Sequence, residues 1–235
     1  MNREGIFEDL GIRDYKETWD YQEELFQNLM AVKLKNRTLA PDEYVKQVNR
    51  LLFVEHPHVY TLGRNGSDKN LLVNHIQLQA RDASFYRIDR GGDITYHGPG
   101  QIVGYPLLDL EEFGLTLKDY IECIEEVIIR SLREYGIEAV RMKGATGVWL
   151  DGQGQGQTRK ICAIGVKASR HITMHGFAFN INTDLDYFNH INPCGYTDKG
   201  VTSLAKELGK KQDFEKAKIV VMKNFEEVFG INWKS

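Results

Sequence analysis

The pattern of apolar positions predicts three long helices along the chain. Residues 18–36 and 116–136 carry apolar side chains at helical spacing. Thr116 is suited to cap the second of these helices and Gly136 to end it. A last helix is expected over residues 213–230, which begin with an aspartate and end with a glycine.

Shorter apolar runs between these helices predict strands, flanked by turn residues. They lie at residues 51–62 (broken at Pro57), 85–89, 102–108, 147–150, 160–167 and 176–182. Hairpin-like strand runs mixed with helices favour an α/β (α+β) domain with a mixed sheet over a doubly wound one. Residues 151–160, DGQGQGQTRK, are typical of a flexible hairpin tip. We expect one domain over residues 1–235, with a core at about 50–205 and helical additions at both ends.

Composition excludes several classes of protein. A hydrophobic content of 42% and a charged content of 27% over 235 residues are ordinary for a globular domain, and no apolar run is long enough for a membrane span. Three widely spaced cysteines argue against a disulfide framework and a zinc site, which favours a reducing cytoplasm. The net charge of -3 disfavours nucleic acid as a partner.

Positive charge is concentrated in one half of the chain. Residues 141–211 hold ten Lys/Arg and five Asp/Glu, on a protein that is acidic as a whole. Such a half could face an acidic partner, or it could be a scatter of solvated lysines. Charge alone leaves both interpretations open.

Three cysteines and one lysine are candidates for chemistry. Cys123 and Cys162 lie in apolar segments and are expected to be buried. Cys194 lies between a proline and a glycine in a polar turn, where an accessible thiol near cations can ionise and act as a nucleophile, although it could also be incidental. Lys160 opens an apolar strand, so it either extends to the solvent or activates a thiol.

Two further stretches suggest a binding site. Residues 90–101, RGGDITYHGPGQ, match no nucleotide phosphate loop, but their glycines allow a ligand to approach the backbone closely; a β-bulge is the alternative. Residues 175–182, HGFAFNIN, present one strand face of small and polar side chains, which leaves room for an acyl chain or for close packing. His56 and His58 could ligate a metal, but surface strand histidines are the simpler interpretation.

Three segments together resemble a known family. RGGDITYHGPGQIVGYPLLDL, TGVWL with RKICAIGVKASRHITMHGFAFNINTDL, and INPCGYTDKGVTSL are similar to the octanoyltransferases of the lipoate biosynthesis pathway, from about residue 70 to residue 204. The resemblance implies a single α/β domain related to the lipoate and biotin protein ligases. It also implies transfer of an octanoyl or lipoyl group from acyl carrier protein to a specific lysine of lipoyl-domain proteins.

The resemblance assigns roles to individual residues. It makes Cys194 the acyl-thioester nucleophile and Lys160 the residue that lowers the pKa of its thiol. The stretch before Lys160 is longer and richer in glycine than expected for the family. The substrate-binding positions that the resemblance implies are Arg90, Gly91, Gly92, Asp93, Ile94, Thr95, Tyr96, His97, Ala163, Ile164, Gly165, Gly176, Phe177 and Ala178.

The resemblance further implies the partners. The octanoyl group arrives on the phosphopantetheine of acyl carrier protein, and no ATP, metal or other cofactor is needed. The acceptors are the lipoyl domains of 2-oxoacid dehydrogenases and the glycine cleavage H protein, with neither nucleic acid nor membrane involved. Three alternatives stay open: an ATP-dependent lipoate or biotin-type ligase, a carrier-to-carrier octanoyl amidotransferase, and a non-catalytic acyl-binding module.

Overall fold

The computed structural model describes residues 3–151, 157–192 and 199–234. The helices are α1 (Tyr15–Asn36), α2 (His75–Gln79), α3 (Leu110–Phe113), α4 (Leu117–Arg133), α5 (Leu204–Leu208) and α6 (Phe214–Phe229), with 3-10 turns at η1 (Pro41–Glu43), η2 (Asp68–Asn70) and η3 (Leu185–His190). The strands are β1 (Arg3–Ile12), β2 (Asn49–Glu55), β3 (Val59–Leu62), β4 (Ser84–Arg87), β5 (Ile94–His97), β6 (Gln101–Leu107), β7 (Val140–Met142), β8 (Ala145–Leu150), β9 (Arg159–Ser169), β10 (Ile172–Asn180), β11 (Gly200–Val201) and β12 (Ile231–Lys234).

Nine of the described strands form one mixed sheet. Eight follow the order β12-β1-β2-β6-β10-β9-β8-β7, and β11 pairs with β9 in addition. Strand β1 is parallel to both β12 and β2, and β11 is parallel to β9, whereas the other pairs are antiparallel. Strands β4, β3 and β5 form a smaller sheet. The expected α/β class with a mixed sheet is confirmed.

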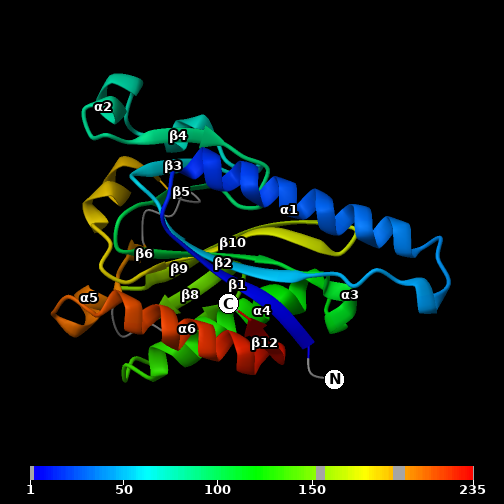
Figure 1. Cartoon of the computed structure of the whole chain (residues 1–235). Coiled ribbons are helices and arrows are strands. Elements are labelled where there is room, and N and C mark those ends of the chain that lie inside the picture. Colours follow the sequence, from blue (N-terminus) through cyan, green and yellow to red (C-terminus); the bar gives the residue numbers. More distant parts are fainter. Residues whose placement is uncertain (1–2, 152–156, 193–198, 235) are drawn as a thin grey trace.

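Helices cover both faces of the main sheet, as Figure 1 shows, with α1 on one face and α4 and α6 on the other. The larger core lies under α4 and α6, where Ile124 and Val127 meet Phe177 and Phe179 of β10. A second core lies under α1. No helix in the described part of the chain is long and apolar enough to cross a membrane.

Helix α4 forms for the reasons that its sequence indicates. The Thr116 side chain accepts a hydrogen bond from the Asp119 N–H, and the Asp119 carboxylate accepts one from the Thr116 N–H, which completes a capping box. Gly136 follows the helix with a φ of 73°, a left-handed conformation that favours glycine. The prediction of this helix is confirmed.

The two ends of the chain were expected to add helices alone, and each also adds a strand to the main sheet. Besides the predicted helices, they contribute strands β1 and β12, which pair with each other from Arg3 opposite Ile231 onward. The segment that forms β1, REGIFEDLGI, shows no regular alternation of apolar and polar residues, so its pattern did not indicate a strand. The glycine-rich stretch also contains a strand, β5, which pairs with β3.

The two strands of the expected hairpin before Lys160 are present as β8 and β9. Strands β8 and β9 run antiparallel, with Trp149 opposite Lys160 and Leu150 opposite Arg159. Residues 152–156 of the tip lie outside the described part of the chain. The hairpin places Lys160 at the beginning of a long central strand.

Candidate active site

A cavity of about 530 Å³ opens where the end of the main sheet meets the small sheet and η3. Its walls come from segments far apart in sequence, including the glycine-rich stretch, β8 to β10 and β11. The candidate residues that line it are Arg90, Gly92, Asp93, Ile94, Thr95, His97, Lys160, Ala163, Ile164, Gly165, Gly176, Phe177 and Ala178. The structure therefore brings most of the candidate positions to one cavity.

Two candidate positions lie beside the cavity instead of lining it. The Gly91 N–H donates to the carbonyl of Val166 at 2.9 Å, which fastens the glycine-rich stretch to β9. Tyr96 is fully buried in the core of the small sheet, and its hydroxyl lies 2.7 Å from Nδ1 of His58. Pairing of β5 with β3 accounts for the difference, because it directs Tyr96 away from the wall that Thr95 and His97 form.

Arg90 is a buried cation at the inner wall. Its Nη2 donates to the carbonyl and the hydroxyl of Thr61 at 2.7 and 2.9 Å, and its Nη1 donates to the Gly91 carbonyl at 3.0 Å. Gly165 passes so close that a Cβ on it would lie 2.9 Å from Cδ of Arg90. Glycine at this position is what allows the arginine to pack against β9.

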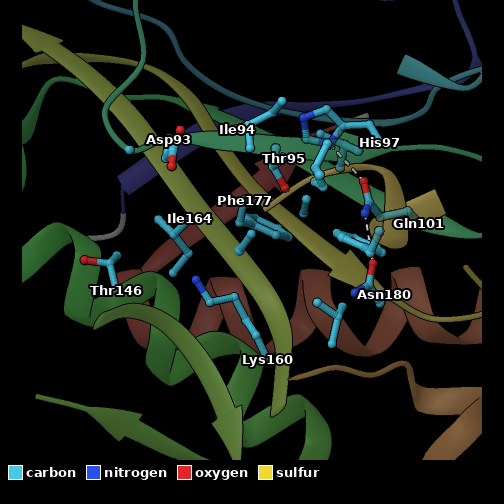
Figure 2. A pocket seen from close by; sticks show the side chains of 18 of the residues that line it. Asp93, Ile94, Thr95, His97, Gln101, Thr146, Lys160, Ile164, Phe177 and Asn180 are labelled. Atoms are coloured by element: carbon cyan, nitrogen blue, oxygen red, sulfur yellow. Dashed lines mark hydrogen bonds between the residues drawn. The ribbon is translucent and has the colours of Figure 1, made fainter. Parts of the chain in front are cut away.

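A chain of hydrogen bonds connects the glycine-rich stretch with the strand that carries Lys160. Nδ1 of His97 lies 2.9 Å from Oε1 of Gln101, and Gln101 donates to Oδ1 of Asn180 at 2.9 Å (Figure 2). Asn180 in turn donates to the carbonyl of Thr202, whose own N–H donates to the carbonyl of Lys160. Burial lowers the pKa of His97 to about 3, so the imidazole is neutral and donates from Nδ1.

Gln101 and Asn180 lie in the two stretches that suggest a binding site, but the resemblance named neither as a substrate-binding position. Both are buried polar side chains in strands, and their partners become visible only when β6 and β10 are placed side by side. The pairing of Asn180 opposite Gln101 is the local reason for their contact.

Lys160 projects into the cavity from the second position of β9. Its Nζ lies 4.5 Å from the centroid of the Trp149 ring, within the range of a cation–π contact. Figure 2 shows its amino group directed toward Ile164. A half-buried ammonium on an aromatic face can stabilise an anion that forms in the cavity, and as the free amine it can accept a proton.

Cys194, the predicted nucleophile, lies outside the described residues. Asn192 and Lys199, which flank that segment, both line the cavity. The Asn192 N–H donates to the carbonyl of Asn70 at 2.8 Å, and the Asn70 side chain donates to Asp93 at 2.5 Å. The glycine-rich stretch therefore holds the segment that leads to Cys194.

Of the two cysteines expected to be buried, Cys162 is buried and Cys123 is only partly buried. Cys162 is fully buried, and burial raises the pKa of its thiol far above the ordinary value despite the nearby Lys160. Cys123 is half-buried against the core beneath α4, and burial raises the pKa of its thiol as well. A raised pKa keeps both thiols protonated near neutral pH, and a protonated thiol is a poor nucleophile.

The expectation of surface histidines in the His56-Pro57-His58 segment is wrong for His56, which is fully buried; both histidines have structural partners. His56 contacts the Arg13 carbonyl through Nδ1 at 2.8 Å and the Tyr105 hydroxyl through Nε2 at 2.9 Å. His58 stacks on Tyr187 of η3 with ring centroids 4.1 Å apart. Among the described residues, no group of three or more His, Cys, Asp or Glu side chains has the geometry of a metal site.

Several basic residues of the 141–211 half are neutralised within the molecule. Lys167 pairs with Asp89 at 2.7 Å and Glu23 at 3.5 Å, and Arg159 pairs with Asp151 and Glu207. In contrast, the exposed Lys206 lines the cavity. Lys206 is therefore one exposed positive charge of this half that lies at the cavity, whereas the exposed Lys143, Arg170, Lys210 and Lys211 lie elsewhere on the surface.

Comparisons with known proteins identify the family. Residues 14–226 match the lipoyl protein ligase A/B catalytic domain family. The chain is 56% identical over 230 residues to an octanoyltransferase of Flavobacterium johnsoniae, covering 97% of this chain and 98% of the relative. It is 53% identical over 235 residues to an octanoyltransferase of Christiangramia forsetii, covering 100% and 99%.

A solved structure agrees with this assignment at the level of the fold. The bipartite lipoate protein ligase of Thermoplasma acidophilum superposes with a TM-score of 0.70 at 14% identity, covering 100% of this chain and 87% of that chain. At such low identity the likeness shows the shared fold alone. The family match and the full-length relatives show that the chain belongs to the lipoyl protein ligase A/B catalytic domain family, among its octanoyltransferases, and is an acyltransferase of the lipoate pathway.

Proposed function

We propose that the chain transfers an octanoyl group from acyl carrier protein to a lysine of a lipoyl domain through a thioester on Cys194, without ATP, metal or another cofactor. The observation that supports this most directly is the position of Lys160. A cation projects into the cavity, and both residues that flank the Cys194 segment line the same cavity.

In the first step, the Cys194 thiolate attacks the thioester carbonyl of the octanoyl-phosphopantetheine. The bond from the carbonyl carbon to Cys194 Sγ forms, and the bond to the phosphopantetheine sulfur breaks. One thioester replaces another, so the step is close to isoenergetic and needs no nucleotide. Lys160 as the ammonium stabilises the attacking thiolate and can protonate the leaving thiolate.

In the second step, the ε-amine of the acceptor lysine attacks the acyl-Cys194 carbonyl. The amide bond forms as the bond to Sγ breaks, and the conversion of thioester to amide is downhill. Lys160 as the free amine accepts the proton that the attacking amine loses, which restores the ammonium beside the thiolate. One residue therefore serves both steps in opposite protonation states.

The partners follow from the same chemistry. The donor is an acyl carrier protein, which is an acidic protein in general, and the exposed lysine at the cavity opening suits it. The acceptors are the lipoyl domains of 2-oxoacid dehydrogenases and the glycine cleavage H protein. A reducing cytoplasm is the proposed location, because the chemistry requires a free thiol.

Mass spectrometry after mixing the chain with octanoyl-acyl carrier protein tests the proposal. We expect an octanoyl adduct on Cys194 without ATP, and its loss when a lipoyl domain is added. Labelling of the acceptor that depends on ATP and octanoate would support a ligase instead. No adduct and no labelling would indicate an acyl-binding module.

A further inference from the structure

A buried carboxylate near Lys160 has no part in the chemistry described so far. Glu125 lies on α4 with its side chain against the sheet, and only 6% of the residue is exposed. Its Oε1 accepts a hydrogen bond from the Gly147 N–H at 2.9 Å, and its Oε2 lies 3.3 Å from Nε of Arg141. Burial raises the pKa of Glu125, whereas the Gly147 N–H, Arg141 and Lys160 act against this rise. A buried acid of this kind calls for a functional or structural reason.

The peptide that Glu125 holds lies against Lys160. Gly147 has a φ of 117°, and a Cβ on it would lie 2.5 Å from the Cys162 carbonyl and 3.4 Å from Cε of Lys160. Glu125 thus fixes the β8 backbone at the point where it forms one side of the space occupied by the lysine. Trp149, two residues further along β8, provides the ring beneath the ammonium.

The charges around Lys160 come from several elements. Glu125 on α4 interacts with it electrostatically, since the lysine charge lowers the pKa of Glu125. Because such an interaction is reciprocal, the Glu125 charge favours the protonated lysine to the same extent. Arg141 of β7 opposes this effect, and Arg159 of β9 is neutralised by its own acids. The same cavity is lined by further charged side chains of both signs: Arg90, Lys199 and Lys206 are basic, and Asp93 and Asp186 are acidic.

We infer that Glu125 is a positioning residue for Lys160: its carboxylate fixes the Gly147 backbone beside the lysine, and its charge keeps the lysine protonated between turnovers. This inference rests on the proposed function, in which Lys160 works both as ammonium and as amine.

Glu125→Gln separates the charge from the hydrogen bond. The amide oxygen can still accept from the Gly147 N–H and the volume is conserved, so the fold is retained, but the negative charge is lost. Glu126→Gln is the matched control, because Glu126 pairs with the same Arg141 at 2.7 Å but is not bonded to Gly147. Arg141→Gln is the opposite probe, since it removes a cation.

Brief acetic anhydride labelling across a pH series, read at Lys160 by peptide mass spectrometry, measures the lysine pKa without any need for Cys194 chemistry. We expect Glu125→Gln to move the midpoint down by about half to one pH unit and Arg141→Gln to move it up, with no shift in Glu126→Gln. A midpoint unchanged in Glu125→Gln, or one that moves equally in Glu126→Gln, would overturn the inference.

A second measurement relates the shift to turnover. Single-turnover transfer from acyl-Cys194 to a lipoyl domain should reach its half-maximal rate at a correspondingly lower pH in Glu125→Gln. A purely structural role would lower the rate without moving this profile. Absence of acyl-Cys194 in the unmodified protein would refute the proposed function, while the labelling midpoints would still decide the role of Glu125.

Discussion

The backbone N–H of Thr202 donates to the carbonyl oxygen of Lys160 at 2.9 Å. Val201 lies opposite Lys160 in the parallel pairing of β11 with β9. The chain that emerges from the Cys194 segment is therefore fixed to the strand position that carries the lysine. A pairing of this kind keeps two distant parts of the sequence in register.

The first prediction concerns the reactivity of the three cysteines. Cys194 should alkylate faster than Cys123 or Cys162, because burial raises the pKa of both other thiols and Cys162 is fully buried. Brief iodoacetamide treatment of the folded protein followed by peptide mapping measures the order. Cys162 is the rival nucleophile, and its labelling before Cys194 would refute the assignment.

The second prediction concerns the packing of Arg90 against β9. Gly165→Ala places a Cβ 2.9 Å from both Cδ of Arg90 and the Gly91 carbonyl, so the arginine and the glycine-rich stretch must move. We expect a loss of about 1–3 kcal/mol in the free energy of unfolding and slower acylation. Urea titration and an acylation assay measure the two effects.

Gly200→Ala is the matched control for this change, because Gly200 also lines the cavity. A Cβ there would lie 3.6 Å from the Arg159 Cβ, an ordinary contact. Equal losses in the two variants would show that the close approach of Arg90 to Gly165 is unimportant.

The sequence indicated the elements that local patterns determine. The Thr116 cap, the apolar stripe of α4 and the alternation in β10 each depend on neighbouring residues, and each was predicted. Strand β1 was not predicted, because its sequence shows no regular alternation and its parallel partners, β2 and β12, lie elsewhere in the chain. No local pattern marks such a parallel pair.

A site residue could be predicted where its own residue type is unusual for its surroundings, and not where its role depends on which other residue it contacts. Lys160 was singled out as a charge in an apolar strand. Gln101, Asn180 and Glu125 gave no such signal, since a buried polar residue becomes informative only when its partner is known. Tyr96 was assigned to the binding loop because it lies among polar residues, but strand pairing buries it in the small sheet.

The third prediction concerns stability at acidic pH. Burial lowers the pKa of His97 to about 3 and that of His56 to about 4. The unfolded chain, with histidine pKa values of about 6.5, therefore binds protons that the folded chain excludes. The free energy of unfolding should be nearly constant above about pH 6.5, the pKa of histidine in the unfolded chain. As the pH falls below about 6.5, the free energy of unfolding should decrease by up to about 1.4 kcal/mol per pH unit for each histidine, until the pH reaches the pKa of that histidine in the folded chain.

Urea unfolding at pH 7.5 and at pH 5.5 measures this loss. His56→Gln should reduce the difference, because glutamine can donate to the Arg13 carbonyl and accept from Tyr105 without taking up a proton. An equal loss in the unmodified protein and in His56→Gln would contradict the role of His56.

The fourth prediction concerns docking of the acidic donor. Lys206→Glu should lower kcat/KM for octanoyl-acyl carrier protein by about three- to tenfold at low salt, because the lysine lines the cavity opening and is exposed. Turnover of a small octanoyl thioester should change little. Lys35→Glu, on the exposed end of α1, is the control and should affect neither donor. Equal effects of Lys206→Glu on both donors would refute docking at this opening.

The last prediction concerns Lys160 itself. Lys160→Ala removes the cation, so the Cys194 thiol pKa should rise by about one to three units toward roughly 8.5. Acylation at neutral pH should then slow by roughly tenfold or more, because the thiolate fraction falls faster than its nucleophilicity rises. Raising the pH should restore the first step more than the second, which has also lost its proton acceptor.

Lys160→Arg distinguishes the two roles of the lysine, because arginine keeps the charge but cannot act as a base near neutral pH. The variant should form acyl-Cys194 and release it slowly to a lipoyl domain, which rapid-quench mass spectrometry of the acyl-enzyme can follow. Fast release from Lys160→Arg would show that another group accepts the proton. A pH–alkylation profile of Cys194 that is the same in Lys160→Ala as in the unmodified protein would show that the thiol and the lysine do not interact.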